Sequence, residues 1–332
     1  MYAQWLAQFR ALTDLGNRSG TSLDTYTNRW NKLLLPRIKS LRICELTPGR
    51  IDRILQDLNA THSASTARTC RAILSGLCGV AVRHGALTHN PVRDAQPVEP
   101  SKRKQPARVL TIAEALHIFE LLDTDEIAVR QDLPDIARYL AGTGNRTGEI
   151  LAIRWDTTNL AERTVYIEGN VVRIKGQGLT INHGKTAMAT RPIPLTDWLV
   201  DLLVDRRKRM AALQNIAPED LTGWVFPNTH GGLREAANMR RDWRALRNRH
   251  ALGDWFTPYT LRRTVATLLT DKLPAREVSD LLGHSRISQT TDTYVGRKII
   301  SRGPAAVLNA LGDVKNGSFT EPQPYPSRPD GL

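Results

Sequence analysis

The sequence has few cysteines and no long hydrophobic run. None of the three cysteines in its 332 residues forms a CxxC pair, and this spacing favours a reduced, cytoplasmic protein. No apolar stretch approaches the length of a membrane span, and Gln4, Gln8 and Arg10 interrupt the apolar residues at the N-terminus. We therefore expect neither a transmembrane helix nor a signal peptide.

Acidic residues are in the minority. Asp and Glu number 33 against 46 Lys and Arg, which gives a formal net charge of +13. Such an excess favours a polyanionic partner, with nucleic acid as the leading candidate, although charge alone leaves open a basic surface of no special function. The length, with 41% hydrophobic and 24% charged residues, is typical of a globular protein of two domains.

Residues 1–95 predict a small helical domain, because apolar residues recur on one helical face in three segments. The stripes are Tyr26, Trp30, Leu33 and Leu34; Ile51, Ile54, Leu55 and Leu58; and Ala67, Cys70, Leu74, Leu77, Cys78 and Ala81. Residues 96–108 are rich in proline and charge and show no periodicity, so they predict a basic linker. Its Lys102, Arg103 and Lys104 either follow a DNA backbone or belong to a solvated linker.

Residues 109–312 predict a second domain that is mostly α-helical with a small antiparallel sheet, which places the chain in the α+β class. Helices are expected near 111–122, 132–142, 196–213, 234–250, 260–272 and 275–283, and strands at 164–168, 171–175 and 179–182. The proline-rich end, 313–332, is expected to be a disordered tail.

Two arginines stand in segments suited to bind phosphate. Arg146 lies at a turn loosened by glycines, where a phosphate oxygen can approach the backbone and the guanidinium together. Glu149 either braces this guanidinium or is an ordinary acid in the first turn of a helix. Arg262 and Tyr259 stand at a helix start and are expected to point away from its buried stripe. An arginine there opposes the helix dipole, so a bound phosphate or a nearby carboxylate should compensate for its charge.

A tyrosine follows near the C-terminus. Gly283-His284 closes a short helical pattern, and Tyr294 comes ten residues later among small polar residues. With separated basic residues upstream, such a tyrosine could attack a DNA phosphate.

The four segments occur in the order and spacing of the tyrosine recombinases, and the sequence resembles that family over about residues 1–312. The motifs are Gly144-x-Arg146-x-x-Glu149, Tyr259-x-x-Arg262, Leu282-Gly283-His284 and Tyr294. The stretches 257–269 and 281–297 look most like the integrases of actinobacterial phages and mobile elements. Four motifs in one order are far more specific than any one of them.

The resemblance implies a SAM-like helical core-binding domain at 1–95 and a catalytic domain at 109–312. It implies a site-specific recombinase that integrates or excises a phage or mobile element, acting on double-stranded DNA at attachment sites as a homotetramer on two duplexes. A directionality factor and a host DNA-bending protein are further expected partners. The segment Ala305 to Leu311 is expected to dock on a neighbouring protomer. Some integrases carry a small arm-binding domain before the core-binding domain; we expect this sequence to start after that position, so that either the sequence is a truncated form or the protein works without arm sites.

The resemblance also implies a role for each motif residue. Tyr294 is expected to be the nucleophile that forms a 3′-phosphotyrosyl linkage, while Arg146 and Arg262 stabilise the phosphate charge without a metal ion, ATP or other cofactor. Lys185, on a hairpin loop, is expected to protonate the leaving 5′-oxygen, with Lys175 as its competitor. His284 is expected to bind the phosphate or to position the tyrosine.

One position departs from the family pattern. Where the family usually has histidine, this chain has Tyr259, which can donate a hydrogen bond to phosphate but is a poor general base near neutral pH. This leaves two alternatives beside the recombinase, a DNA-binding accessory protein that no longer cuts, and an enzyme of the type IB topoisomerase kind that nicks and closes strands.

A basic helix is predicted at 234–250. Arg240, Arg244 and Arg247 share one side of it, with Trp243 and Leu246 towards the core. We expect the three arginines to contact DNA phosphates rather than to form a merely solvated face.

Overall fold

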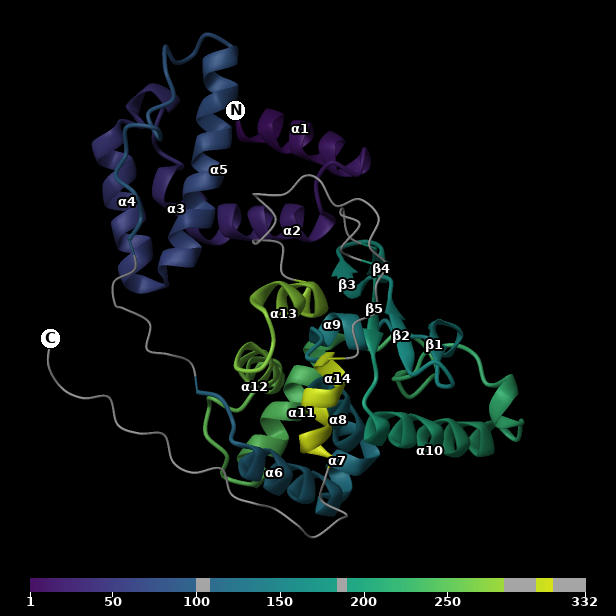
Figure 1. Ribbon diagram of the computed structural model, residues 1–332. Coiled ribbons are helices and arrows are strands. Elements are labelled where there is room, and N and C mark those ends of the chain that lie inside the picture. Colours follow the sequence, from purple (N-terminus) through teal and green to yellow (C-terminus); the bar gives the residue numbers. More distant parts are fainter. Residues whose placement is uncertain (100–107, 184–189, 284–302, 313–332) are drawn as a thin grey trace, which may run out of the picture. The chain divides into compact units, whose positions relative to one another are not determined.

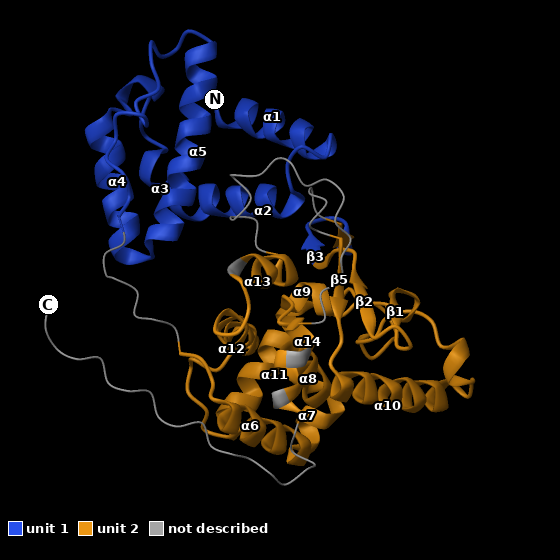
Figure 2. Cartoon of the chain, in the orientation of Figure 1, with its two compact units in different colours: residues 1–107, 172–180 blue, residues 108–171, 181–332 orange. Residues whose placement is uncertain are grey.

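The computed structural model describes residues 1–99, 108–183, 190–283 and 303–312 (Figure 1). Contacts divide the chain into two compact units, one of residues 1–107 and 172–180 and one of residues 108–171 and 181–332 (Figure 2). The fold is mostly helical with a small antiparallel sheet, which confirms the predicted class. Among the helices in the described ranges, none is long and apolar enough to cross a membrane.

The first unit contains five α-helices whose apolar faces form its core. They are α1 (Tyr2–Asp14), α2 (Gly20–Arg29), α3 (Leu35–Ile38), α4 (Pro48–Thr61) and α5 (Ala64–Arg83). The predicted stripes are buried except for Tyr26 and Ile54, which are partly buried, and Leu34, Ile51 and Leu74 are fully buried. A π-helical turn, Trp30–Leu34, joins α2 to α3, just before Pro36, which has no N–H to donate to the preceding turn.

The second unit contains the remaining helices, and α8 and α12 pack against each other within it (Figure 1). The helices are α6 (Ile112–Thr124), α7 (Glu126–Arg130), α8 (Leu133–Thr143), α9 (Thr147–Ile150), α10 (Asp197–Gln214), α11 (Ala236–Arg249), α12 (Pro258–Thr270), α13 (Ala275–Leu282) and α14 (Gly303–Leu308). The six helices predicted in this part of the chain are confirmed, each with both ends within two residues. The short helices α7 and α14 were not predicted, whereas α9 begins where the sequence analysis placed Glu149 in a first helical turn.

A three-stranded antiparallel sheet has the order β1-β2-β5. The strands are β1 (Thr158–Asn159), β2 (Thr164–Ile167) and β5 (Arg191–Pro194), and β3 (Asn170–Ile174) with β4 (Gly178–Asn182) forms a separate two-stranded sheet. The sequence patterns did not predict β5, because proline, present here as Pro192 and Pro194, has no backbone N–H to donate and is rare within strands. Proline is tolerated at a sheet edge, and β5 is the edge strand beside β2, where Ile167 faces Arg191.

The segment from α14 to the turn Asn309–Leu311 packs on its own unit. Leu308 and Leu311 are buried, α14 contacts α8 and α12, and the Trp198 indole N–H donates to the Leu308 carbonyl at 3.2 Å. In the single chain these leucines are thus buried within the same unit, and docking of the segment on a neighbouring protomer remains a prediction.

Candidate active site

The turn between α8 and α9 positions Arg146 and Glu149. Gly144 follows α8 in the left-handed conformation (φ 65°), and Arg146 is the N-cap residue directly before α9. The Arg146 backbone N–H donates to Glu149 Oε2 at 2.9 Å, and its Nη1 donates to Oε1 at 2.8 Å. Glu149 is therefore both the first-turn acid and the partner of the guanidinium. The Arg146 side chain is 45% exposed and that of Glu149 only 8%, so the arginine faces solvent and the carboxylate lies behind it.

Arg262 lies beneath Arg146 and is buried, with an exposed fraction of 2%. The expectation that it points away from the buried part of α12 is wrong. Its Nη1 donates to the Gly144 carbonyl and its Nη2 to the Leu282 carbonyl, both at 2.7 Å. Burial, followed by the neighbouring charge of Arg146, lowers the pKa of Arg262 to about 10. The charge is only partly compensated by Glu149, which leaves it suited to an added anion.

A third arginine, Arg191 of β5, completes the cluster, and sequence analysis missed it. Its side chain is 9% exposed and its Nη2 donates to Glu149 Oε2 at 3.0 Å. One signal in the sequence could have revealed its burial. Arg191 stands two residues before the apolar Ile193, and residues two apart in a strand face the same side; both are buried in β5. A second signal was Glu149, which the sequence paired with Arg146 alone.

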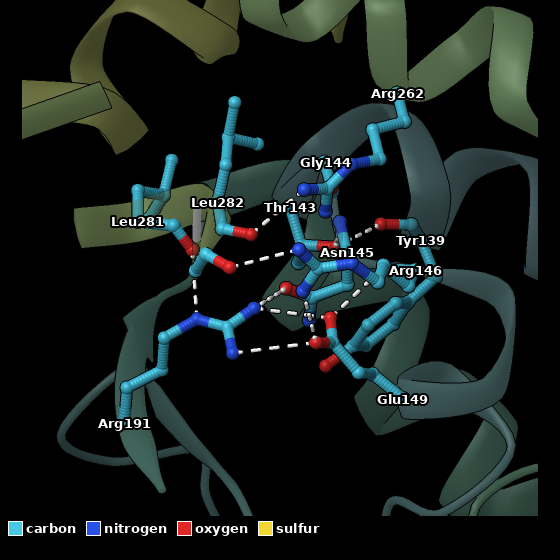
Figure 3. A network of polar contacts seen from close by, with 11 residues as sticks. Tyr139, Thr143, Gly144, Asn145, Arg146, Glu149, Arg191, Arg262, Leu281 and Leu282 are labelled. Atoms are coloured by element: carbon cyan, nitrogen blue, oxygen red, sulfur yellow. Dashed lines mark hydrogen bonds and ion pairs between the residues drawn. The ribbon is translucent and has the colours of Figure 1, made fainter. Parts of the chain in front are cut away.

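The three arginines hold three consecutive backbone carbonyls at the end of α13. Arg191 Nε donates to Leu281 at 2.9 Å, Arg262 Nη2 to Leu282 at 2.7 Å, and Arg146 Nη2 to Gly283 at 2.8 Å. Carbonyls in the last turn of a helix have no intrahelical partner and carry partial negative charge. Figure 3 shows the three guanidiniums close together, with Arg191 beside the Leu281 carbonyl, Arg262 beside the Leu282 carbonyl, and Glu149 bonded to both Arg146 and Arg191. Three cations thus surround one carboxylate and leave a net positive charge, with Arg146 as the exposed member.

Tyr259, at the start of the same helix as Arg262, is 58% exposed. The Arg263 guanidinium lies 5.5 Å from the centre of its ring. Its hydroxyl is thus on the surface of the second unit, free of the core. The expected phosphate contact by this tyrosine remains a prediction.

Six predicted residues lie outside the described ranges, namely Lys102, Arg103, Lys104, Lys185, His284 and Tyr294. The competitor Lys175 is described and is exposed in the turn between β3 and β4. Gly283, the last described residue before His284, lies within the arginine cluster.

The basic helix α11 presents two of its three predicted arginines to solvent. Arg240 and Arg244 are exposed and make no ion pair within the described part of the chain. Arg247 differs, because its side chain is 12% exposed and paired with Asp254 at 2.5 Å. It follows the buried Trp243 by one turn and so borders the core-facing stripe.

Comparison with known proteins identifies the family. The phage integrase family pattern matches residues 108–298, and the phage integrase central domain matches residues 3–97. An integrase of Streptomyces ambofaciens is 26% identical over 324 residues, which cover 92% of this chain and 78% of the relative. A XerC-like tyrosine recombinase of Caldanaerobacter subterraneus subsp. tengcongensis is 25% identical over 270 residues, 76% of this chain and 67% of the relative.

A solved structure has a similar fold. The Tn1549 transposon integrase, in complex with a circular intermediate DNA, superposes with a TM-score of 0.70 at 18% identity, covering 89% of this chain and 95% of that one. The class defined by fold and motifs is that of the site-specific tyrosine recombinases, as the sequence predicted. The chain belongs to the phage integrase family.

Proposed function

We propose that this recombinase cuts and rejoins DNA to integrate or excise a mobile element, and that its anion site of Arg146, Arg191, Arg262 and Glu149 is the seat of the scissile phosphate. The observation that carries the proposal is the uncompensated positive charge of this cluster beside an exposed guanidinium. A phosphodiester under attack gains negative charge on its non-bridging oxygens, and forked guanidiniums match that geometry.

In the proposed reaction the Tyr294 oxygen attacks the phosphorus and the bond to the 5′-oxygen breaks. The 5′-oxygen takes a proton from Lys185, while the phenol proton passes to His284 or to solvent. The phosphotyrosyl ester keeps the energy of the broken bond, so the 5′-hydroxyl of a second strand can attack it and release the tyrosine. Metal ions and ATP are not needed for either step.

The predicted domains divide the proposed work on DNA. Residues 1–95 form the core-binding domain, 96–108 the basic linker with Lys102, Arg103 and Lys104, and 109–312 the catalytic domain. Arg240 and Arg244 are the favoured phosphate contacts on α11, because both are exposed and unpaired among the described residues. The structure of the related transposon integrase with DNA supports double-stranded DNA as the partner.

The proposed assembly is a homotetramer. Each protomer carries one nucleophile, and exchange between two duplexes requires four strand cuts. A directionality factor, a host DNA-bending protein and a cytoplasmic location complete the proposal. The noncutting accessory protein and the topoisomerase-like enzyme are not favoured, because the phosphate seat and the family motifs are present together.

The proposal is tested with nicked duplexes tiled from the DNA that flanks the gene, incubated in EDTA and run on a denaturing gel. We expect a covalent protein–DNA adduct, reduced about 10²- to 10³-fold in Arg146→Gln, as for loss of one donor to a developing oxyanion. Arg163→Gln is the matched control, because Arg163 is also a half-exposed arginine paired with one carboxylate, Asp197. An adduct that forms equally well in both variants would contradict the proposed seat.

A further inference from the structure

Arg191 is one of the two buried arginines of the cluster, the other being Arg262, and it is far less exposed than Arg146. Its side chain is 9% exposed, against 45% for Arg146. All three nitrogens of its guanidinium donate to protein groups, which are Glu149, the Leu281 carbonyl and, at 3.4 Å, the Asn145 side chain. Arg191 can therefore act on the site through these partners.

The first partner is Glu149, whose carboxylate is held symmetrically. Oε2 accepts from the Arg146 backbone N–H at 2.9 Å and from Arg191 Nη2 at 3.0 Å. Oε1 accepts from Arg146 Nη1 at 2.8 Å and from Arg191 Nη1 at 3.4 Å. Each oxygen thus has one donor from each arginine. Without Arg191 the Glu149 carboxylate would be free to rotate, and the Arg146 guanidinium bonded to it would change its orientation.

The second partner is the end of α13. Arg191 Nε holds the Leu281 carbonyl at 2.9 Å, and Gly283 packs directly on the guanidinium. A Cβ built on Gly283 would lie 2.8 Å from Arg191 Cζ, and the φ of Gly283 is 63°. The chain continues from Gly283 straight to His284, so Arg191 fixes the point from which the proposed histidine and tyrosine segment departs.

We propose that Arg191 is a positioning residue of the recombination reaction, which aims the Arg146 guanidinium through Glu149 and anchors the end of α13 against the phosphate seat. This inference rests on the proposed function. A buried ion pair adds little to stability compared with apolar packing, so geometry accounts for the arrangement better than folding energy does. In this proposal Arg146 binds the phosphate, and Arg191 fixes the orientation of the Arg146 guanidinium.

The proposal has a consequence for pH dependence. The charged groups that face Glu149 are Arg146, Arg191 and Arg262. Burial by itself raises the pKa of Glu149, but the charge and hydrogen bonds of Arg191, with a smaller part from Arg146, outweigh burial and lower it. The carboxylate is therefore present above the ordinary pKa and is lost only as pH falls through the lowered value. Without Arg191 that loss moves to higher pH.

The experiment measures the rate of adduct formation on saturating nicked duplex across pH, the affinity for the same duplex, and the melting temperature Tm. In Arg191→Met we expect the rate to fall about 10- to 100-fold, as for loss of a supporting partner, with DNA affinity little changed and the acid limb at higher pH. Arg191→Lys keeps the charge but not the fork, so its acid limb should stay near that of wild type while its rate remains reduced.

The matched control is Arg206→Met. Arg206 is equally buried, pairs with Asp132 and Asp135, and donates to the Val225 carbonyl, but it contacts the beginning of α8, whereas the site lies at the end of that helix. It should lower Tm without moving the acid limb. In Arg191→Met the buried Glu149 carboxylate loses a partner. The double variant Glu149→Gln/Arg191→Met removes that charge as well, so it should restore Tm but not the rate of adduct formation.

Each other outcome overturns a particular claim. A wild-type rate and pH profile in Arg191→Met, or a rate that recovers together with Tm in the double variant, would show that Arg191 is only structural. If wild type and Arg206→Met form no adduct on any duplex, the proposed function is wrong, and the inference on Arg191, which rests on it, is wrong too. If both form the adduct and only the Arg191 prediction fails, the function stands.

Discussion

Replacement of Gly144 by alanine tests how tightly the phosphate seat is packed. Gly144 has a φ of 65°, and its carbonyl accepts a hydrogen bond from Arg262. A Cβ at this position would lie 2.7 Å from Leu282 Cδ2 and 2.8 Å from Val265 Cγ1. Both neighbours are buried, at 0% exposure each, so neither can move into solvent to make room.

The expected loss has two parts. An alanine in the left-handed conformation costs about 1–2 kcal/mol, and overpacking of a filled core costs about 1–3 kcal/mol. Gly144→Ala should therefore lower the free energy of unfolding by about 2–5 kcal/mol. Gly223→Ala is the control, because Gly223 also has a positive φ of 85° but no atom within 4 Å of the added Cβ. Gly223→Ala should therefore show only the cost of the left-handed backbone, about 1–2 kcal/mol.

The assay is urea unfolding of both variants, followed by adduct formation on a nicked duplex. Because the Gly144 carbonyl holds Arg262 and Arg146 follows two residues later, Gly144→Ala should also slow the cleavage of DNA. Gly223→Ala should cleave at the wild-type rate. Equal destabilisation by the two alanines would refute the packing argument, and normal cleavage by Gly144→Ala would refute its link to the site.

Three further predictions concern charge and the residue at the family's histidine position. Burial, followed by the charge of Arg146, lowers the pKa of Arg262 to about 10. The guanidinium is therefore still charged at neutral pH, where its burial destabilises the folded state, and this cost is relieved only as pH rises through that value; a bound anion should relieve it too. Exchange of chloride for sulfate at constant ionic strength should raise Tm more in wild type than in Arg262→Gln, and an equal rise would speak against the anion site. Arg240→Ala and Arg244→Ala should each reduce the salt dependence of DNA binding by about one unit of slope in log Kd against log salt, measured by fluorescence anisotropy, and an unchanged slope would remove the residue from the interface. Tyr259→His should speed adduct formation near neutral pH, because histidine is the better base there; an unchanged rate would mean that proton removal does not involve this position.

The local features of the fold followed from the sequence. Helix ends in the second unit were predicted to within two residues, because a stripe of apolar residues on one face and the caps beside it are encoded within each segment. The contact between Arg146 and Glu149 is of the same local kind, since three residues in a first helical turn bring the two together.

The rest of the site depends on contacts between distant segments. Arg191 meets Glu149 across 42 residues and Leu281 across 90, and no pattern near Arg191 specifies either partner. The burial of Arg262 follows from the carbonyls of Gly144 and Leu282, which lie in other elements. Arg247 was expected on the exposed side of α11 but is mostly buried and paired with Asp254. A residue at the border of a helical stripe is buried or exposed according to its neighbours, which the helix alone does not specify.

The central claim is that this recombinase breaks DNA through a tyrosine bound covalently to phosphate. The most direct measurement is mass spectrometry of the protein–DNA adduct after digestion by nuclease and protease. The account predicts a phosphonucleotide on the peptide that carries Tyr294, and no adduct from Tyr294→Phe. A nucleotide on another residue, or strand cleavage that leaves no protein on the DNA, would contradict it.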